Sequence, residues 1–395
     1  MIRHALSCLR SPLDATVSTG GRMAAMEGLR GVAALLVFLV HYAAFTRPWV
    51  GYEGPTSDVW MVLFNGGRLG VDVFFVLSGY LIYSLLLARP LPIVDFARRR
   101  VRRIYPTFLA VFALYIVLSM LAPAHSKLPA DPADAGVYVL QNLLLLPGLF
   151  DIRPMVAVAW SLSYEIAYYL VAPVIVWALD MRTMAPWKRV LVWSAVGGLL
   201  ILEHEHSIAA LFTVGILMYE LIAFQKARGG APRQPLIDVA AVAVVGAALS
   251  VILALEGSAE TDVARPVVIG AVIAAGLGSF ALGYAALGCD GWIARLLSTA
   301  PLRWMGNVSY SFYLIHSVTL RVVFTAVALV VPAGAQSSWV FWAMFVPALA
   351  ASSAAALALF VLVERPLSLA PTRRSRTAVP SLATPVPASP SAEAS

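Results

Sequence analysis

Residues 29–46 read LRGVAALLVFLVHYAAFT, an apolar run whose length approaches the roughly 20 residues that a helix needs to cross a bilayer. Only two of its side chains are ionisable, Arg30 near the start and His41 near the end. An ionisable group inside lipid costs free energy, so its presence there indicates function. This stretch predicts a membrane helix and marks His41 as a candidate functional residue.

The rest of the chain has the same character. Of its 395 residues, 60% are hydrophobic and only 12% are charged, and the mean hydropathy is +0.82. An average soluble domain has about 25% charged residues, and a soluble core cannot hide so much apolar surface. This composition excludes a disordered chain, a nucleic-acid-binding basic domain and an ordinary cytosolic enzyme. It predicts an all-α membrane protein, a polytopic bundle of about ten transmembrane helices in a lipid bilayer.

The predicted spans follow from the apolar runs. The run at 190–203 is the shortest of them. A further apolar segment, 137–150, is too short to cross easily and predicts an interfacial or re-entrant piece. We expect spans near 29–46, 67–88, 105–122, 159–179, 190–203, 208–224, 236–255, 266–288, 305–330 and 339–363.

The basic residues predict the orientation. The net charge is +7, and the isoelectric point is near 9.5. With the N-terminus inside, most Lys and Arg fall in cytoplasmic segments, which fits the positive-inside rule and requires no nucleic-acid partner. An even number of spans then places both termini in the cytoplasm of a multi-pass protein of the cell (inner) membrane. One span missed or wrongly assigned would invert half of this map.

The sequence divides into three parts. We expect a disordered N-terminal extension at 1–22, a membrane domain at 23–368 and a disordered Pro/Ser/Ala-rich cytoplasmic tail at 369–395. The two cysteines, Cys8 and Cys289, form no metal-binding pattern. The sequence predicts neither a metal site nor a permanently bound cofactor.

Arg30 and His41 share one face of their helix. They are 11 residues apart, which is nearly three whole turns and roughly 16 Å along the axis. A cation at the membrane rim suits a phosphate, and a neutral imidazole in a dry pocket suits a general base. The structural alternative is an interfacial arginine and a histidine bonded to a helix carbonyl.

Among the other ionisable residues within predicted spans, four are candidates for function. By depth, Asp72, Glu165, His316 and Arg321 gather with His41 in the middle and outer half of the membrane. A carboxylate could orient His41, or Asp72 or Glu165 could pair with Arg321. Depth alone does not choose between these arrangements.

The segment Asp95–Pro106 (DFARRRVRRIYP) holds five arginines in six positions. Such a cluster is typical of a positive-inside anchor. It also suits a phosphate clamp, because arginine binds phosphate through two parallel hydrogen bonds. Both roles can hold at once.

Six segments in order resemble the bacterial acyltransferase-3 family of integral membrane O-acyltransferases. That family acylates surface sugars such as O-antigen, exopolysaccharide and Nod factor, and also some macrolide antibiotics. The resemblance covers residues 23–368. The segments are GLRGVAALLVFLVHY (28–42), LGVDVFFVLSGYLI (69–82), FARRRVRRIYP (96–106), WSLSYEIAYYL (160–170), GNVSYSFYLIH (306–316) and ERP (364–366).

The resemblance implies a set of roles. The family's basic residue, ten residues and histidine fall on Arg30 and His41. It implies an acyl-CoA co-substrate, most simply acetyl-CoA, and an essential histidine in acyl transfer. The acceptor would be a carbohydrate, a lipid-linked glycan or a macrolide-type molecule. We expect catalytic roles for His41, Glu165 and Asp72, donor binding by Arg30, Arg99, Arg102 and Arg103, and acceptor binding by His316, Ser309 and Tyr310.

The sequence departs from the family pattern at one motif. Glu165 is followed by Ile166, where the family usually has a second acidic residue. A two-carboxylate mechanism is therefore disfavoured. A proton-coupled transporter would also place His, Asp and Glu in the bilayer, and a non-catalytic membrane partner is a third alternative. The arginine-rich segment and the lack of an internal repeat favour the acyltransferase.

Overall fold

The protein is described by a computed structural model. The description covers residues 21–88, 92–123, 126–203, 205–229, 235–257, 265–334 and 337–369. Nearly all of the predicted extension at 1–22 and tail at 369–395 lies outside these ranges. All the long elements in the described part are helices, which confirms the all-α prediction.

The helices fall into two groups by length. The short helices are α3 (Pro55–Gly66), α6 (Pro132–Leu143), α12 (Trp292–Leu297), α13 (Ala300–Asn307) and α15 (Trp339–Ala343). The long helices are α2 (Gly21–Thr46), α4 (Leu69–Ala88), α5 (Ile93–Leu121), α7 (Ala159–Ala178), α8 (Pro186–Glu203), α9 (Ala210–Ala227), α10 (Pro235–Gly257), α11 (Arg265–Gly288), α14 (Ser309–Ala328) and α16 (Phe345–Leu359), the last continued by the π-helix η5 (Phe360–Leu369).

Within the described ranges, nine helical segments are long and apolar enough to cross a membrane. The tenth predicted span, 190–203, lies in α8, which is an 18-residue helix that also carries Lys188, Arg189 and Glu203. Three charges in so short a helix explain why it is less apolar than the other nine. Arg189 is neutralised by Glu220 of α9, with 2.7 Å between Nε and Oε1. The bundle therefore agrees with the predicted number of about ten helices.

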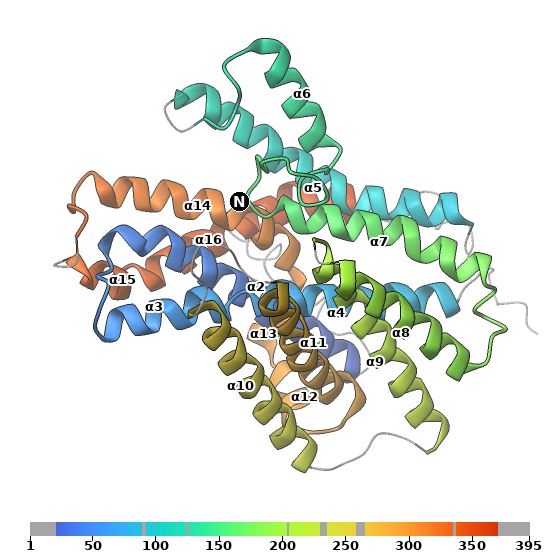
Figure 1. Cartoon of the computed structure of the whole chain (residues 1–395). Helices are drawn as coiled ribbons and strands as arrows, with labels where there is room; N and C mark the ends of the chain where they lie inside the picture. The colour runs from blue at the N-terminus through green and yellow to red at the C-terminus, as the bar shows by residue number, and fades with distance from the viewer. Residues whose placement is uncertain are drawn as a thin grey trace, which may run out of the picture.

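The long helices run mostly side by side (Figure 1). Helix α2 packs against α4, α13 and α14, so its residues reach the middle of the bundle. Helices α10 and α11 pack on one another and stand at an angle to the rest, and α6 projects from the bundle (Figure 1). The segment predicted to be interfacial or re-entrant, 137–150, includes the end of α6, a helix of 12 residues that is too short to span.

Close backbone contacts fix the start of α2. A Cβ atom on Gly306 would lie 1.7 Å from the carbonyl oxygen of Glu27, and one on Gly28 would lie 1.8 Å from that of Leu297. Only glycine permits this approach of α2 to α12 and α13. The contact also corrects the predicted span at 305–330, because α13 ends at Asn307 and α14 begins only at Ser309.

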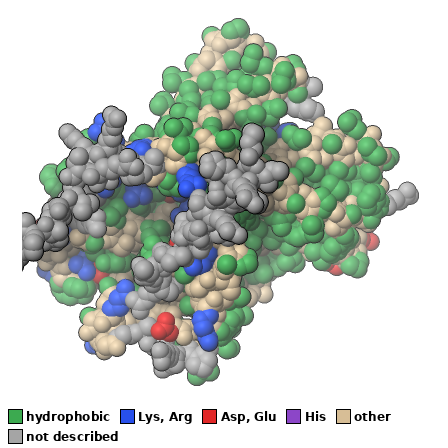
Figure 2. All heavy atoms as spheres, turned by 180° about the vertical axis from the view of Figure 1, so that it is seen from behind, with side chains coloured by type: hydrophobic (Ala, Val, Ile, Leu, Met, Phe, Trp, Pro, Cys, Tyr) green, Lys and Arg blue, Asp and Glu red, His purple; other side chains and the backbone are tan. Residues whose placement is uncertain are grey.

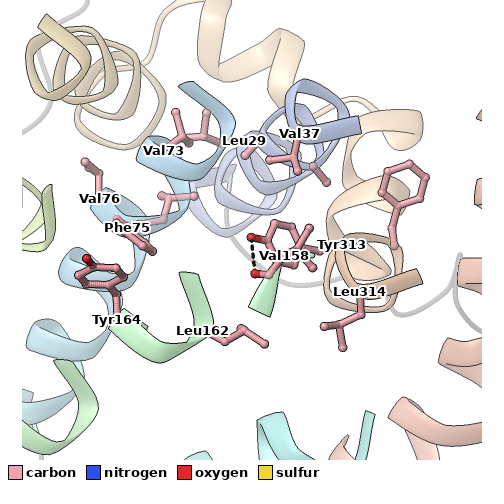
Figure 3. Packing of buried hydrophobic residues seen from close by; sticks show 14 of the residues in the cluster. Leu29, Val37, Val73, Phe75, Val76, Val158, Leu162, Tyr164, Tyr313 and Leu314 are labelled. Atoms are coloured by element: carbon pink, nitrogen blue, oxygen red, sulfur yellow. Dashed lines mark hydrogen bonds between the residues drawn. The ribbon is translucent and has the colours of Figure 1, made fainter. Parts of the chain in front are cut away.

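The core lies where α2, α4, α7 and α14 meet (Figure 3). Aromatic stacking extends it to α9, since the rings of Phe75 and Phe212 have centroids 4.6 Å apart. The outer surface is also largely apolar, as lipid requires, and Lys and Arg gather towards the end at which α5 begins (Figure 2). The labelled core residues are Leu29 and Val37 of α2, Val73, Phe75 and Val76 of α4, Val158 directly before α7, Leu162 and Tyr164 of α7, and Tyr313 and Leu314 of α14.

Candidate active site

Two neighbouring cavities lie within the helix bundle. The first, which we call the arginine cavity, has a volume of about 150 Å³ and lies among α2, α4, α5, α7 and α14. Its charged lining residues are Arg30, Arg100, Arg103 and Glu165. Three guanidinium groups around one carboxylate leave an excess of positive charge, which suits an anionic ligand.

Each arginine of this cavity is held by a different contact. Arg30 donates from Nη2 to the Ser309 hydroxyl at 3.2 Å. The guanidinium carbon of Arg100 lies 5.2 Å from the centre of the Phe96 ring and 5.5 Å from that of Tyr169. The buried Nε of Arg100 has no hydrogen-bond partner within the described part of the chain. Arg100 also lines the arginine cavity.

Glu165 lies in the arginine cavity and not beside His41. Its Oε1 accepts a hydrogen bond from the Ser78 hydroxyl at 3.2 Å and another from the Tyr169 hydroxyl. The carboxylate therefore faces the same space as Arg30. This position differs from both alternatives for Glu165, orienting His41 or pairing with Arg321, whose guanidinium carbon lies 5.6 Å from the centre of the Phe45 ring.

Glu364 does not line the arginine cavity itself, but it binds Arg103, which does. Its fully buried carboxylate accepts from Arg103 Nη1 at 2.6 Å and from the backbone N–H and hydroxyl of Ser311 at 3.2 and 2.5 Å. These contacts join α5, α14 and η5. A buried carboxylate needs such partners, because a buried charge without them is strongly destabilising. The ERP segment thus fixes the position of Arg103.

The second cavity, which we call the histidine cavity, has a volume of about 440 Å³. Its ionisable lining residues are His41 of α2, Asp72 of α4 and Arg68, which precedes α4. The wall from α10 and α11 is apolar and consists of Ile252, Ala271, Val272 and Ala275. The side of the cavity that α2 and α4 form therefore carries both charged and apolar side chains, including Val37, Val40 and Val71, whereas the side that α10 and α11 form is apolar throughout.

His41 is positioned by its own helix. Its Nδ1 lies 2.9 Å from the carbonyl oxygen of Val37, one turn earlier. A carbonyl can only accept a hydrogen bond, so Nδ1 carries the proton and Nε2 of the neutral ring keeps its lone pair. The structural alternative predicted a hydrogen bond from His41 to a carbonyl oxygen of its own helix, and this hydrogen bond is present. It also prepares Nε2 to accept a proton, with no carboxylate needed to hold the ring.

His316 lies directly beside His41. The two ring centroids are 4.8 Å apart, and the rings meet edge to face at 79°. His316 is fully buried, and its Nδ1 lies 2.9 Å from the carbonyl oxygen of Phe312. Its Nε2 has no partner in the described ranges. Both imidazoles therefore present an unbonded nitrogen within a tightly packed environment.

Tyr313 and Val71 line both cavities. The Tyr313 hydroxyl donates to the carbonyl oxygen of Val158 at 3.1 Å (Figure 3) and lies 2.5 Å from the Ser161 hydroxyl. These bonds hold the ring in place between the two spaces. The two cavities therefore adjoin at the side chains of Tyr313 and Val71.

The sequence-predicted residues thus fall into two groups. The structure brings His41, Asp72 and His316 together at the histidine cavity, although His316 is not among the residues that line it. Arg30, Arg103, Glu165, Ser309 and Tyr310 all line the arginine cavity.

Two of the predicted arginines do not line either cavity. Arg99 is exposed, and Arg102 donates from Nε to the Leu367 carbonyl oxygen at 3.2 Å. The sequence-based prediction missed Arg100 in their place, as well as Glu364. The arginine run pointed to Arg100 and the ERP motif to Glu364, but neither pattern indicated which side chains face inward.

A group of three possible metal ligands lies away from both cavities. The ligand atoms of Glu203, Glu205 and His206 lie within 4.8 Å of one another. Both carboxylates are exposed, and His206 Nδ1 is 2.9 Å from the Tyr164 hydroxyl. Exposed acidic groups commonly lie together without a metal, so these residues carry no metal assignment.

The fold and the two cavities define a polytopic helical membrane protein with an arginine-lined cavity next to a cavity that contains one histidine of a contacting pair. Residues 23–361 match a family model described as an acyltransferase domain. The chain therefore belongs to this acyltransferase family, which confirms the resemblance seen in its motifs.

Named relatives agree with this membership. The chain is similar to the O-acetyltransferase OatA of Staphylococcus aureus, with 26% identity over 163 residues, covering 38% of this chain and 24% of the relative. A second relative from that species, with a provisional O-acetyltransferase name, is 23% identical over 329 residues, covering 76% of this chain and 51% of the relative. The chain thus spans between a quarter and a half of the length of these relatives. No solved structure matches it.

Proposed function

We propose that this protein transfers an acyl group, in the simplest case acetyl, from acyl-CoA to a hydroxyl group of a carbohydrate or glycosylated acceptor. The family membership and the O-acetyltransferase names of the relatives support this proposal. The observation that carries it is the junction at Tyr313 and Val71. There, a cavity with three arginines meets a cavity that contains His41.

Donor binding is assigned to the arginine cavity. Arg30, Arg100 and Arg103 bind phosphate oxygens of the coenzyme, because guanidinium groups match phosphate in charge and geometry. The thioester then extends along the face of α2 that leads from Arg30 to His41. In the predicted orientation this cavity opens towards the cytoplasm, where acyl-CoA is made.

The chemical step uses His41 as a general base. Its Nε2 takes the proton of the acceptor hydroxyl while the oxygen attacks the thioester carbonyl carbon. The new C–O bond forms, the C–S bond breaks, and the proton passes from His41 to the departing sulfur. Coenzyme A therefore leaves as the thiol, and one acyl group moves for each CoA released.

Asp72 stabilises the cation that His41 becomes during this step. It lines the same cavity and is only 8% exposed, so its field is weakly screened. Glu165 has a different role, because it lies among the arginines. There it holds Tyr169 and Ser78 in place at the donor pocket.

The test uses the full chain reconstituted in liposomes with radiolabelled acetyl-CoA and an extract of host glycans, lipids and small metabolites. His41→Asn should lower label transfer about 10²- to 10⁴-fold, the usual contribution of a general base. The asparagine amide still donates to Val37, so the helix keeps its contact.

His206→Asn is the matched control, because His206 lies outside both cavities. It should retain full activity. Unchanged transfer by His41→Asn would refute the mechanism. If folded wild-type protein released no CoA from acetyl-CoA or longer acyl-CoAs, the transporter alternative would replace it.

A further inference from the structure

The histidine cavity joins two kinds of surface. Its charged or imidazole side chains are His41 of α2, Asp72 of α4 and Arg68, which directly precedes α4. Its wall on α10 and α11 consists of Ile252, Ala271, Val272 and Ala275, which offer no side-chain hydrogen bond. A ligand that fills this space must therefore be polar in one part and apolar in the other.

This division disfavours a fully hydrophilic acceptor. The hydroxyl groups of a free glycan would lose water against the apolar wall and find no partner there, and each buried hydroxyl without a partner costs free energy. An apolar chain gains from the same contact in proportion to the surface that it buries. The apolar wall and the reacting His41 therefore favour an acceptor with a hydroxyl-bearing head and an apolar chain.

The apolar wall is thin on its outer side. Ala271 and Ala275 of α11 line the cavity, whereas Ile273 and Leu277 of the same helix are 46% and 59% exposed on the outer surface. Helix α11 therefore has one face on the cavity and another on the apolar outer surface of the protein. The two alanines lie one turn apart, and their small side chains leave the space open.

The acyl chain of the donor is a weaker candidate for this space. The relatives are named as O-acetyltransferases, and an acetyl group has only two carbons. It does not need a cavity of about 440 Å³ beyond the Tyr313 junction. The acceptor is then the reactant that has to fill the cavity.

We propose that the histidine cavity binds an amphipathic, membrane-borne acceptor, with its hydroxyl-bearing head at His41 and its apolar chain against α10 and α11. This inference rests on the proposed acyl transfer and adds the substrate class. The acceptor of this enzyme is a glycolipid-like molecule and not a soluble polysaccharide.

The test measures acetyl transfer to alkyl glucosides that share one head group. The full chain in liposomes receives acetyl-CoA and methyl, hexyl, octyl or decyl glucoside, each below its micelle concentration. The wild type should show a kcat/KM that rises roughly two- to fourfold for each added methylene. Because longer chains also concentrate in the bilayer, variants are needed to separate partitioning from binding.

The series Ala271→Val, Ala271→Leu and Ala271→Phe fills the cavity in steps. It should progressively lower kcat/KM for the long-chain glucosides relative to that for methyl glucoside, and so remove the preference for long chains. Leu277→Phe adds a ring to the outer face of the same helix and is the matched control. It should keep the wild-type dependence, since partitioning is the same for all variants. The milder Val and Leu variants keep the test valid where the Phe variant fails to fold.

A second readout needs no turnover. A photoreactive octyl glucoside should crosslink to peptides of α10 and α11, and Ala271→Phe should abolish this crosslinking while Leu277→Phe retains it. Crosslinking that is equal in all variants overturns the proposal. CoA release with equal kcat/KM on methyl and decyl glucoside also overturns it but leaves acyl transfer intact.

Two further outcomes are informative. If Ala271→Phe changes the preference for the acyl chain of the donor and not for the acceptor, the cavity holds the acyl chain and the proposal is wrong. If no acceptor in the series or in the host extract causes CoA release, acyl transfer itself fails and this inference fails with it.

Discussion

The imidazole rings of His41 and His316 lie edge to face, with their centroids 4.8 Å apart, although the residues are separated by 275 positions in the chain. Each ring donates from Nδ1 to the carbonyl oxygen one turn earlier in its own helix. The Nε2 of His316 has no hydrogen-bond partner within the part of the chain that the structure describes. His41 thus lies at the wall of the histidine cavity, and His316 is fully buried next to it.

His316→Phe tests whether the second ring acts through His41. Phenylalanine preserves packing against Phe38 and Phe312, whose rings surround His316, but removes the lone pair. If His316 positions or shares the proton of His41, kcat should fall about ten- to a hundredfold, less than on loss of His41 itself. The KM for acetyl-CoA should not change, and the melting temperature should stay close to that of the wild type. Full activity would reduce His316 to a packing residue.

The arginine run offers a matched pair of variants. Arg100→Gln removes a guanidinium group that lines the arginine cavity, and Arg99→Gln removes one that is exposed beside it. Arg100→Gln should raise the KM for acetyl-CoA about ten- to a hundredfold, the equivalent of one or two lost charged hydrogen bonds, with little change in kcat. Arg99→Gln should leave both constants almost unchanged. Equal effects of the two substitutions would assign donor binding to the general positive charge and not to this cavity.

Much of the fold follows from hydropathy alone. Backbone groups in lipid must be bonded within the helix, so apolar runs of sufficient length translate directly into spanning helices. The pairing of Arg30 with His41 on one face also follows from the sequence, because 11 residues make nearly three whole turns. Both residues indeed line adjoining cavities.

The remaining site could not be predicted, because depth in the membrane does not give the direction in which a side chain points. Glu165 and Asp72 are at similar predicted depths, yet they line different cavities. Arg99 and Arg100 differ by one position, which rotates the side chain by about 100° around the helix. The break at Val308 was also hidden, because it depends on the contact of Gly306 with the backbone of Glu27.

Tyr313 separates the two cavities, and its substitution should join them. Tyr313→Ala removes the ring that both cavities share and lets water approach the thioester. Hydrolysis of acetyl-CoA without an acceptor should then rise severalfold, while transfer to the acceptor falls. Tyr313→Phe keeps the ring and loses only the bonds of the hydroxyl to Val158 and Ser161. Hydrolysis as high in the Phe variant as in the Ala variant would assign the effect to the hydroxyl and not to the partition.

Substitution of Glu364 should lower the stability of the folded protein, because this carboxylate links α5, α14 and η5. Glu364→Leu leaves the backbone N–H of Ser311 without its acceptor and Arg103 without its partner, and loss of one member of a buried ion pair costs about 3–5 kcal/mol. Glu364→Gln keeps an oxygen for Ser311 and should cost less. Arg365→Gln, one position along and exposed, should have almost no effect. Melting of the purified protein in detergent gives the order of stability. A Leu variant as stable as the wild type would show that the ERP segment does not fix α5 to α14.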